Sequence, residues 1–181
     1  ICVTGDLGAA YMGLQLLERE KQIFQSGKDA DFQPDFQGKE YVLERQLKPE
    51  ACIDTVKYLK ENGIVPTSMI DISDGLSSEI LHICKASGVG CRIYEDKIPI
   101  DYATATMADE FNMNITTVAL NGGEDYELLF TIPIDMYDQV KDLEGISVIG
   151  HITEPTDVAA IITRDGKEIE LTAQGWNAFS E

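Results

Sequence analysis

Two aspartates, Asp71 and Asp74, stand three positions apart in the stretch SMIDISDGLSSE, which covers residues 68–79. They lie where an apolar run gives way to a helix-like pattern. A carboxylate at the end of a strand is held rigidly, and the next turn can present a second one to the same Mg²⁺, which prefers oxygen ligands. Ser73 offers a hydroxyl to a phosphate, which a helix N-terminus also attracts. The alternative is a plain turn in which Ser73 or Asp74 caps the helix.

A second acidic turn follows in NGGEDYELLF, residues 121–130. Gly122 and Gly123 suit positions where the backbone must take a positive φ or lie close to a ligand. Glu124 and Asp125 stand at the mouth of this turn. The alternative is an ordinary hairpin loop with solvated acids. Together, the two turns indicate a domain suited to a divalent metal and phosphate.

Two further stretches favour a structural role. VTGDLGAAYMGL, residues 3–14, is similar to a phosphate-binding turn, but it has neither the G-x-G-x-x-G pattern nor the lysine of a Walker A motif. We interpret Gly5 and Gly8 as permitting a tight strand-to-helix turn. Trp176, the single tryptophan, can stack on a flat ring or seal the core.

These motifs need elements to position them, and the spacing of apolar residues predicts those elements. We expect helices over residues 7–24, 50–61, 74–85, 101–112 and 135–143. We expect strands over residues 1–4, 66–72, 89–95 and 146–153, two strand runs flanking NGGED within residues 116–134, and a hairpin around Asp165-Gly166 within residues 158–172. The result is one α+β domain over residues 1–181, a mixed sheet packed with helices, with a flexible loop at residues 25–40.

Composition narrows the class of protein. The 181 residues include 32 acidic and 14 basic side chains, a formal net charge of −18. A field of this sign repels nucleic acid and anionic membranes, so we expect neither as a partner, and a phosphorylated substrate needs cations beside it. No apolar run reaches the roughly 20 residues that cross a bilayer.

The cysteine pattern indicates where in the cell the protein works, and the first residues indicate whether the sequence is a whole protein. Four cysteines without a C-x-x-C pair, together with only two histidines, argue against zinc. Scattered cysteines indicate a reducing compartment, so we expect a cytoplasmic protein. The opening ICVTGDLG begins in mid-pattern, and we therefore expect the chain to be a piece of a longer protein.

Several motifs in a fixed order resemble thiamine-monophosphate kinases. They are IDISDGLSSEILHI, SGVG, LNGGEDYELLFTI, IGHIT and a final G-W-x-x-F, with VTGDLGAAYMGL before them. The resemblance implies a two-domain, homodimeric enzyme of the aminoimidazole ribonucleotide synthetase-like superfamily. Its N-terminal domain forms the dimer and carries most ligands of Mg²⁺ and ATP, and this chain is similar to the α+β C-terminal domain that closes the site. The implied reaction phosphorylates thiamine monophosphate to thiamine diphosphate with ATP.

The resemblance also implies roles for individual residues. Asp71 and Asp74 match Mg²⁺ ligands, and Ser73 matches a serine that contacts ATP. Glu124 matches a residue that contacts the thiamine substrate. Trp176, or Phe179 if the alignment of the tail slips, matches an aromatic residue against the substrate. No protein nucleophile is implied, because the metal assists a direct in-line transfer.

One stretch departs from the family pattern, and two other functions stay open. Many relatives carry a Pro-x-Pro-Arg-like stretch where this chain reads RQLKPEACID, although Arg45 and Lys48 keep positive charge there. The alternatives are another ATP-dependent enzyme of the superfamily, such as a purine-pathway synthetase, and a non-catalytic binding module. LNGGEDYELLFT favours the kinase, and the retained carboxylates favour catalysis. We expect this chain by itself to be inactive.

Overall fold

The computed structural model describes residues 1–26 and 33–173, and its strands form two four-stranded sheets. The first sheet is antiparallel throughout, in the order β2 (Ser68–Asp71), β4 (Leu128–Thr131), β1 (Cys2–Thr4), β5 (Ile146–Val148). The second has the order β6 (Gly150–Thr153), β3 (Gly90–Tyr94), β7 (Ala159–Ile162), β8 (Glu168–Glu170). Its β3–β7 pair is parallel, so this sheet is mixed.

The α+β class is confirmed, but the strands divide between two sheets. The single strand expected over residues 146–153 is wrong, because β5 and β6 belong to different sheets. Ile149 separates them and is fully buried, so the chain changes sheets inside the core. The predicted hairpin is confirmed, with Ile161 of β7 opposite Ile169 of β8.

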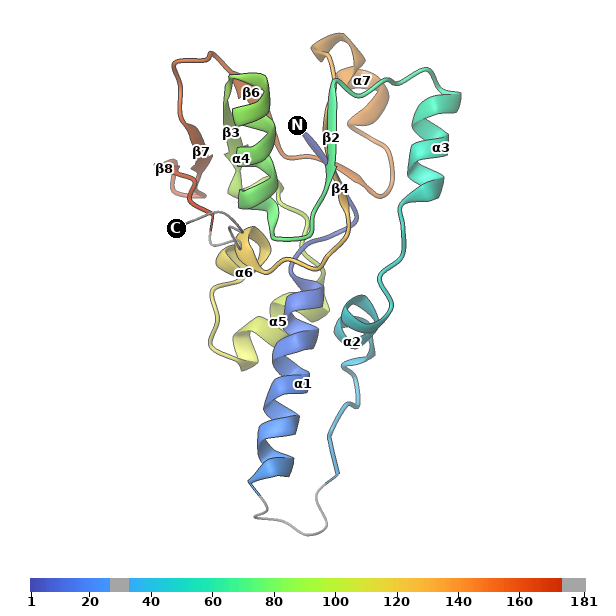
Figure 1. The fold of residues 1–181 in the computed structure, drawn as a ribbon, viewed down its shortest axis with the longest axis vertical. Helices are drawn as coiled ribbons and strands as arrows, with labels where there is room; N and C mark the ends of the chain where they lie inside the picture. The colour runs from blue at the N-terminus through green and yellow to red at the C-terminus, as the bar shows by residue number, and fades with distance from the viewer. Residues whose placement is uncertain (27–32, 174–181) are drawn as a thin grey trace.

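The helices surround the sheets and extend below them in Figure 1. The α-helices of the described ranges are α1 (Ala9–Gln25), α2 (Glu40–Leu47), α3 (Ile53–Glu61), α4 (Leu76–Ser87), α5 (Tyr102–Glu110), α6 (Ile115–Asn121) and α7 (Tyr137–Val140). Short 3₁₀ turns cover Glu95–Lys97 and Ile134–Met136. In the described part of the chain, no helix is both long and apolar enough to cross a membrane.

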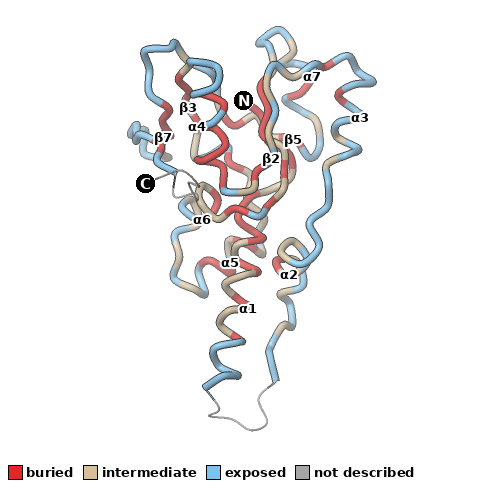
Figure 2. Tube along the Cα trace, viewed as in Figure 1, coloured by how far each residue is buried: buried red, intermediate tan, exposed pale blue. Residues whose placement is uncertain are grey.

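Helix α4 joins the two sheets into one core. It contacts β2 and β4 of the first sheet and β7 of the second. Its Leu76 and Ile80 are fully buried in the same apolar cluster as Val3 of β1 and Ile93 of β3. Figure 2 shows buried residues along α4 and the strands on either side of it. The beginning of α4 is therefore anchored firmly, and this is where the first acidic motif lies.

Helix α6 replaces the strand run that we expected before NGGED. The residues Thr117 and Val118 are typical of strands. However, Asn114 caps a helix here, since its Oδ1 accepts a 2.9 Å hydrogen bond from the Thr117 amide. Val118 and Ala119 are buried, and α6 packs on α4. The cap and the burial of one helical face override the local strand preference.

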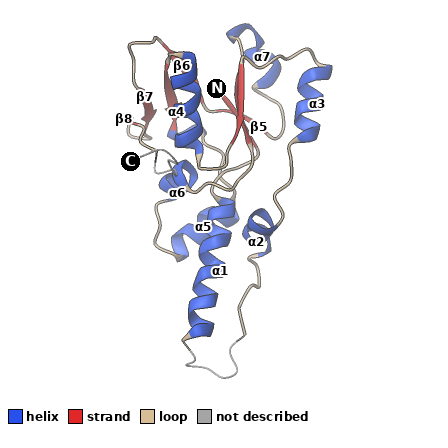
Figure 3. Cartoon of the chain, in the orientation of Figure 1, coloured by secondary structure: helices blue, strands red, loops and turns tan. Residues whose placement is uncertain are grey.

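Helix α2 is an element that the sequence analysis missed. It packs against α1 (Figure 3), and Gly13 permits the close approach, because a Cβ there would lie 2.2 Å from the Val42 carbonyl oxygen. Val42 is the buried residue of this short helix. The contact carries Tyr41 and Arg45 to the turn between β1 and α1.

Candidate active site

The turn between β2 and α4 carries the first predicted motif. Asp71 ends β2 and is exposed, Ile72 is fully buried, and Asp74 is exposed again. The N-cap of α4 is Gly75 at φ 115°, and no side chain caps this helix. The interpretation of Ser73 or Asp74 as the cap is therefore wrong. The buried Ile72 anchors a turn whose acidic side chains reach solvent.

Glu79 in the first turn of α4 supports this acidic turn. Its Oε1 accepts a 3.1 Å hydrogen bond from the Asp74 amide. The side chain is 2% exposed, and burial raises the pKa of Glu79. The backbone of Asp74 is thus held by a buried side chain, while its own carboxylate stays free to meet a ligand.

The glycine turn lies directly against the β2–α4 turn. Gly123 has φ 69°, and a Cβ there would lie 2.6 Å from the Ser73 carbonyl oxygen. The Glu124 amide donates to that carbonyl at 2.7 Å, and the Tyr126 amide donates to the Ile72 carbonyl at 2.8 Å. These bonds extend the antiparallel pairing of β2 with β4. The two acidic motifs of the sequence therefore meet in the fold.

Three exposed carboxylates gather around one phenol. Tyr126 donates a 3.1 Å hydrogen bond to Glu124 Oε2. That bond and the charge of Glu124 raise the pKa of Tyr126, and the charges of Asp71 and Asp74 act in the same direction. Within residues 1–26 and 33–173, no ion pair reaches any of these three carboxylates. The negative charge is left uncompensated, which suits a bound cation.

The described part of the chain does not complete a metal site. It groups no three His, Cys, Asp or Glu side chains closely enough to hold a metal ion. Asp71 and Asp74 are hard oxygen donors of the type that Mg²⁺ takes alongside substrate phosphates and water. The donor chemistry therefore fits Mg²⁺, with part of its ligands coming from elsewhere.

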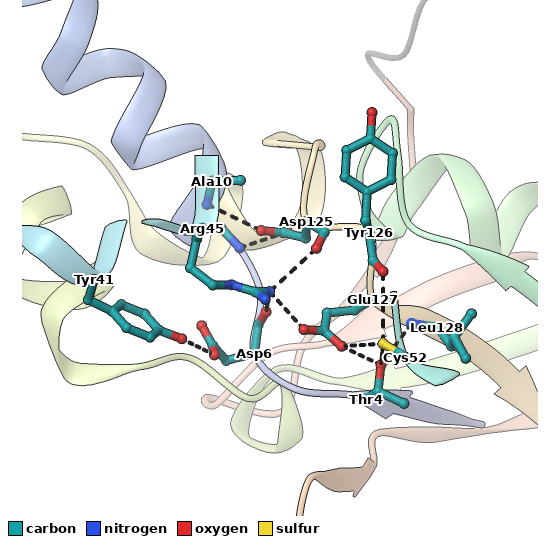
Figure 4. Close-up of polar contacts among 11 residues, drawn as sticks. Thr4, Asp6, Ala10, Tyr41, Arg45, Cys52, Asp125, Tyr126, Glu127 and Leu128 are labelled. Atoms are coloured by element: carbon teal, nitrogen blue, oxygen red, sulfur yellow. Dashed lines mark hydrogen bonds and ion pairs between the residues drawn. The ribbon is translucent and has the colours of Figure 1, made fainter. Parts of the chain in front are cut away.

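A partly buried polar cluster lies behind the glycine turn, and we call it the Arg45 network: Asp6, Tyr41, Arg45, Asp125 and Glu127 (Figure 4). Arg45 Nη2 lies 2.8 Å from Glu127 Oε1. The same atom donates to the carbonyls of Asp6 at 3.2 Å and Asp125 at 3.4 Å. Tyr41 donates its hydroxyl to the Asp6 carboxylate. One arginine thus joins α2 to the β1–α1 turn and to the glycine turn.

Asp125 connects the glycine turn to the start of α1. Its Oδ2 accepts a 2.9 Å hydrogen bond from the Gly8 amide, and its Oδ1 accepts one of 3.4 Å from the Ala10 amide. The side chain is 2% exposed. Burial raises the pKa of Asp125 to about 7, although the two amides and Arg45 act in the opposite direction.

Glu127 occupies the space that Gly5 leaves. A Cβ on Gly5 would lie 2.2 Å from Glu127 Oε1, and Gly5 itself has φ 54°. The Thr4 hydroxyl donates to Glu127 Oε2, and the Cys52 thiol donates to the same oxygen at 3.2 Å. Gly5 and Gly8 both have positive φ, which confirms the predicted tight turn.

The sequence analysis placed the exposed residues of the site but not the Arg45 network. It noted Arg45 only as positive charge. The available signal was the spacing of Tyr41 and Arg45, since residues four apart share one face of a helix. Trp176 and Phe179 lie outside the described residues, so their predicted contact with substrate stays a prediction.

Comparison with known proteins identifies the class. Residues 2–163 match the family described as AIR synthase related protein, C-terminal domain. The chain belongs to this family, as its α+β fold and its acidic turns suggest. Within the match lie β2, α4 and the glycine turn, so every described residue of the site belongs to the shared domain.

The relatives narrow the comparison to one kind of enzyme. The thiamine-monophosphate kinase of Aquifex aeolicus (strain VF5) is 32% identical over 179 residues, which cover 99% of this chain and 51% of the relative. The crystal structure of the thiamine monophosphate kinase from Aquifex aeolicus matches with a TM-score of 0.70 at 31% identity, over 93% of this chain and 50% of that one. The structure of AaThiL complexed with AMPPCP and TMP matches with a TM-score of 0.73 at 31% identity, over 98% of this chain and 50% of that one. This chain spans about half the length of the curated relatives it matches.

Proposed function

We propose that the full-length protein carrying this chain transfers the γ-phosphoryl group of ATP to the phosphate of thiamine monophosphate. An oxygen of the acceptor phosphate bonds to Pγ, the bond from Pγ to the bridging oxygen breaks, and ADP leaves with thiamine diphosphate as product. The observation that carries the proposal is the hydrogen bond from Glu124 to Ser73, which joins two acidic turns in a domain of this family. The relatives named above support the choice of substrates.

Asp71 and Asp74 are the residues of this chain that we propose to hold Mg²⁺. Both are exposed and free of ion pairs among the described residues, and their backbone is fixed by β2 and by Glu79. When bound, Mg²⁺ cancels the repulsion between two phosphorylated substrates and aligns them for in-line transfer. Phosphate oxygens, water and carboxylates outside the described residues would supply the remaining ligands.

The other site residues divide between the two substrates. Ser73 contacts ATP, and the N-terminus of α4 beside it favours phosphate. Glu124 and Tyr126 face the thiamine end of the acceptor, whose thiazolium ring carries a positive charge that a carboxylate stabilises. Trp176, or Phe179 if the alignment of the tail slips, is the aromatic residue that we propose for the same substrate, since an aromatic face suits a cationic ring.

The incomplete set of metal ligands among the described residues supports a partner domain, and the family resemblance supports a dimer. An N-terminal domain of the same protein supplies the missing carboxylates, and the full-length protein is a homodimer. This chain by itself therefore has no kinase activity. Product formed by the 181-residue chain alone would contradict that expectation.

The test measures thiamine diphosphate formed by the full-length protein from thiamine monophosphate, ATP and Mg²⁺. Asp71→Asn keeps the size of the side chain and removes its charge, so we expect a loss in kcat of about a hundredfold or more. Asp135→Asn, at an exposed aspartate in a 3₁₀ turn, is the matched control and should retain full activity. No product from the wild type would refute the kinase, whereas product with an unimpaired Asp71→Asn would refute only the metal role.

A further inference from the structure

The segment from Glu124 to Glu127 places alternate side chains on opposite sides. Asp125 and Glu127 are 2% and 7% exposed and belong to the Arg45 network. Glu124 is exposed, and Tyr126 donates to it. Figure 4 shows the Tyr126 ring pointing away from Arg45. One side of the segment is therefore held inside the protein, and the other faces the proposed substrate.

The exposed side has an unusual backbone. Glu124 has φ 63° and Tyr126 has φ 52°, which places two residues with side chains in the left-handed region. Such a backbone is kept only where surrounding contacts fix it. The contacts on one side are the amide bonds to Ser73 and Ile72.

The contacts on the other side converge on Arg45. Its guanidinium pairs with Glu127 and bonds to the carbonyl of Asp125, so it contacts both inward residues of the segment. It also bonds to the Asp6 carbonyl, which fixes it to the β1–α1 turn. The side chain of Arg45 is 17% exposed and that of Glu127 is 9% exposed, so water competes weakly for this pair.

We propose that Arg45 is a positioning residue for Glu124. By fixing Asp125 and Glu127 on the buried side, it holds Glu124 and Tyr126 in the one arrangement that meets the thiamine end of the acceptor. Arg45 lies behind the turn and acts through these neighbours. The inference rests on the proposed function and adds to it a residue that binds neither substrate.

The test compares Arg45→Met with Arg45→Lys in the full-length protein. We expect Arg45→Met to raise the KM for thiamine monophosphate about tenfold while the KM for ATP changes less than about threefold. Arg45→Lys keeps the charge that pairs with Glu127, so the KM for thiamine monophosphate should increase by no more than half as much as in Arg45→Met. If Arg45→Met fails to fold, Glu127→Gln removes the same ion pair and should give the same split between the two substrates.

Arg92→Met is the matched control. Arg92 pairs with Glu168 at 2.8 Å and its side chain is 18% exposed, close to the values for Arg45, but it lies in the second sheet. We expect this variant to lose stability without a change in either KM. The proposal is overturned if Arg45→Met changes the KM for thiamine monophosphate and the KM for ATP equally, or changes neither. An arginine with a purely structural role would not affect one substrate more than the other.

A second readout does not depend on activity. Hydrogen exchange of the Glu124 and Tyr126 amides reports the bonds to Ser73 and Ile72. We expect these amides to exchange at least about tenfold faster in Arg45→Met and at the wild-type rate in Arg92→Met. Unchanged exchange overturns the positioning of the turn. Faster exchange in a protein that forms no thiamine diphosphate supports the positioning and refutes the proposed function.

Discussion

The Glu124 amide donates a 2.7 Å hydrogen bond to the Ser73 carbonyl, and the backbone of Gly123 lies directly against the same carbonyl. This bond joins the residue that we assign to ATP with the residue that we assign to the acceptor. A rigid connection of this kind matters for a reaction between two bound phosphates, since alignment supplies much of the rate. Gly123 permits this bond, because a side chain at this position would overlap the Ser73 carbonyl.

Gly123→Ala should destabilise the chain more than Gly166→Ala. Both Gly123 and Gly166 have positive φ, which costs a residue with a side chain about 1–2 kcal/mol. Only at Gly123 would the new Cβ also lie 2.6 Å from a carbonyl oxygen, whereas at Gly166 nothing lies within 4 Å. We expect the overlap to add about 1–3 kcal/mol. Urea unfolding of both variants measures the difference, and equal losses would contradict the close packing of the two turns.

Asp125 should make stability fall as pH rises. Burial raises its pKa from 3.8 to about 7, with Arg45 acting against the shift and Asp6 adding to it. The folded state therefore binds this proton more tightly than the unfolded chain, so the contribution of Asp125 to the free energy of unfolding decreases between about pH 4 and about pH 7. The decrease is at most about 4 kcal/mol.

Asp125→Asn removes this pH dependence. Between about pH 5 and about pH 8, the free energy of unfolding of Asp125→Asn should rise relative to that of the wild type. Asp135→Asn, at an exposed position, should show a constant difference from the wild type. Urea unfolding at the two pH values measures both. A constant difference between Asp125→Asn and the wild type over this range would mean that the buried carboxylate stays charged.

Glu124→Gln should lower the pKa of Tyr126. The hydrogen bond to Glu124 is the largest cause of the raised pKa, and an uncharged amide removes the charge that opposes ionisation of the phenol. Ultraviolet titration of the seven tyrosines, with Tyr126→Phe subtracted, isolates this phenol. Glu144→Gln, an exposed glutamate before β5, serves as control. An unchanged titration in Glu124→Gln would show that the two side chains do not pair in solution.

Local patterns predicted the elements with strong periodicity. The helix expected over residues 74–85 is α4, and the strand expected over residues 66–72 is β2 with shorter ends. α2 was not predicted because it spans only eight residues, fewer than the window over which apolar periodicity identifies a helix. The change of sheet at Ile149 was not predicted because only this one residue separates β5 from β6.

The site was predictable to the extent that its residues are close in sequence. The two acidic turns were found as motifs, and the fold brings them together. Their roles toward Mg²⁺, ATP and thiamine monophosphate stay predictions. The Arg45 network could not be found, because Asp6, Arg45 and Asp125 come from distant parts of the chain and meet only through tertiary packing.

The alternation between Glu124 and Glu127 gives four consecutive residues two different roles. Asp125 and Glu127 serve the framework, so a change there is felt by the whole fold. Glu124 and Tyr126 face outward, so a change there leaves the framework intact and acts first on the acceptor that we propose for this turn. Under the proposed function, substitution at the two outward positions alone can therefore change the acceptor, while the two inward positions preserve the framework that holds them.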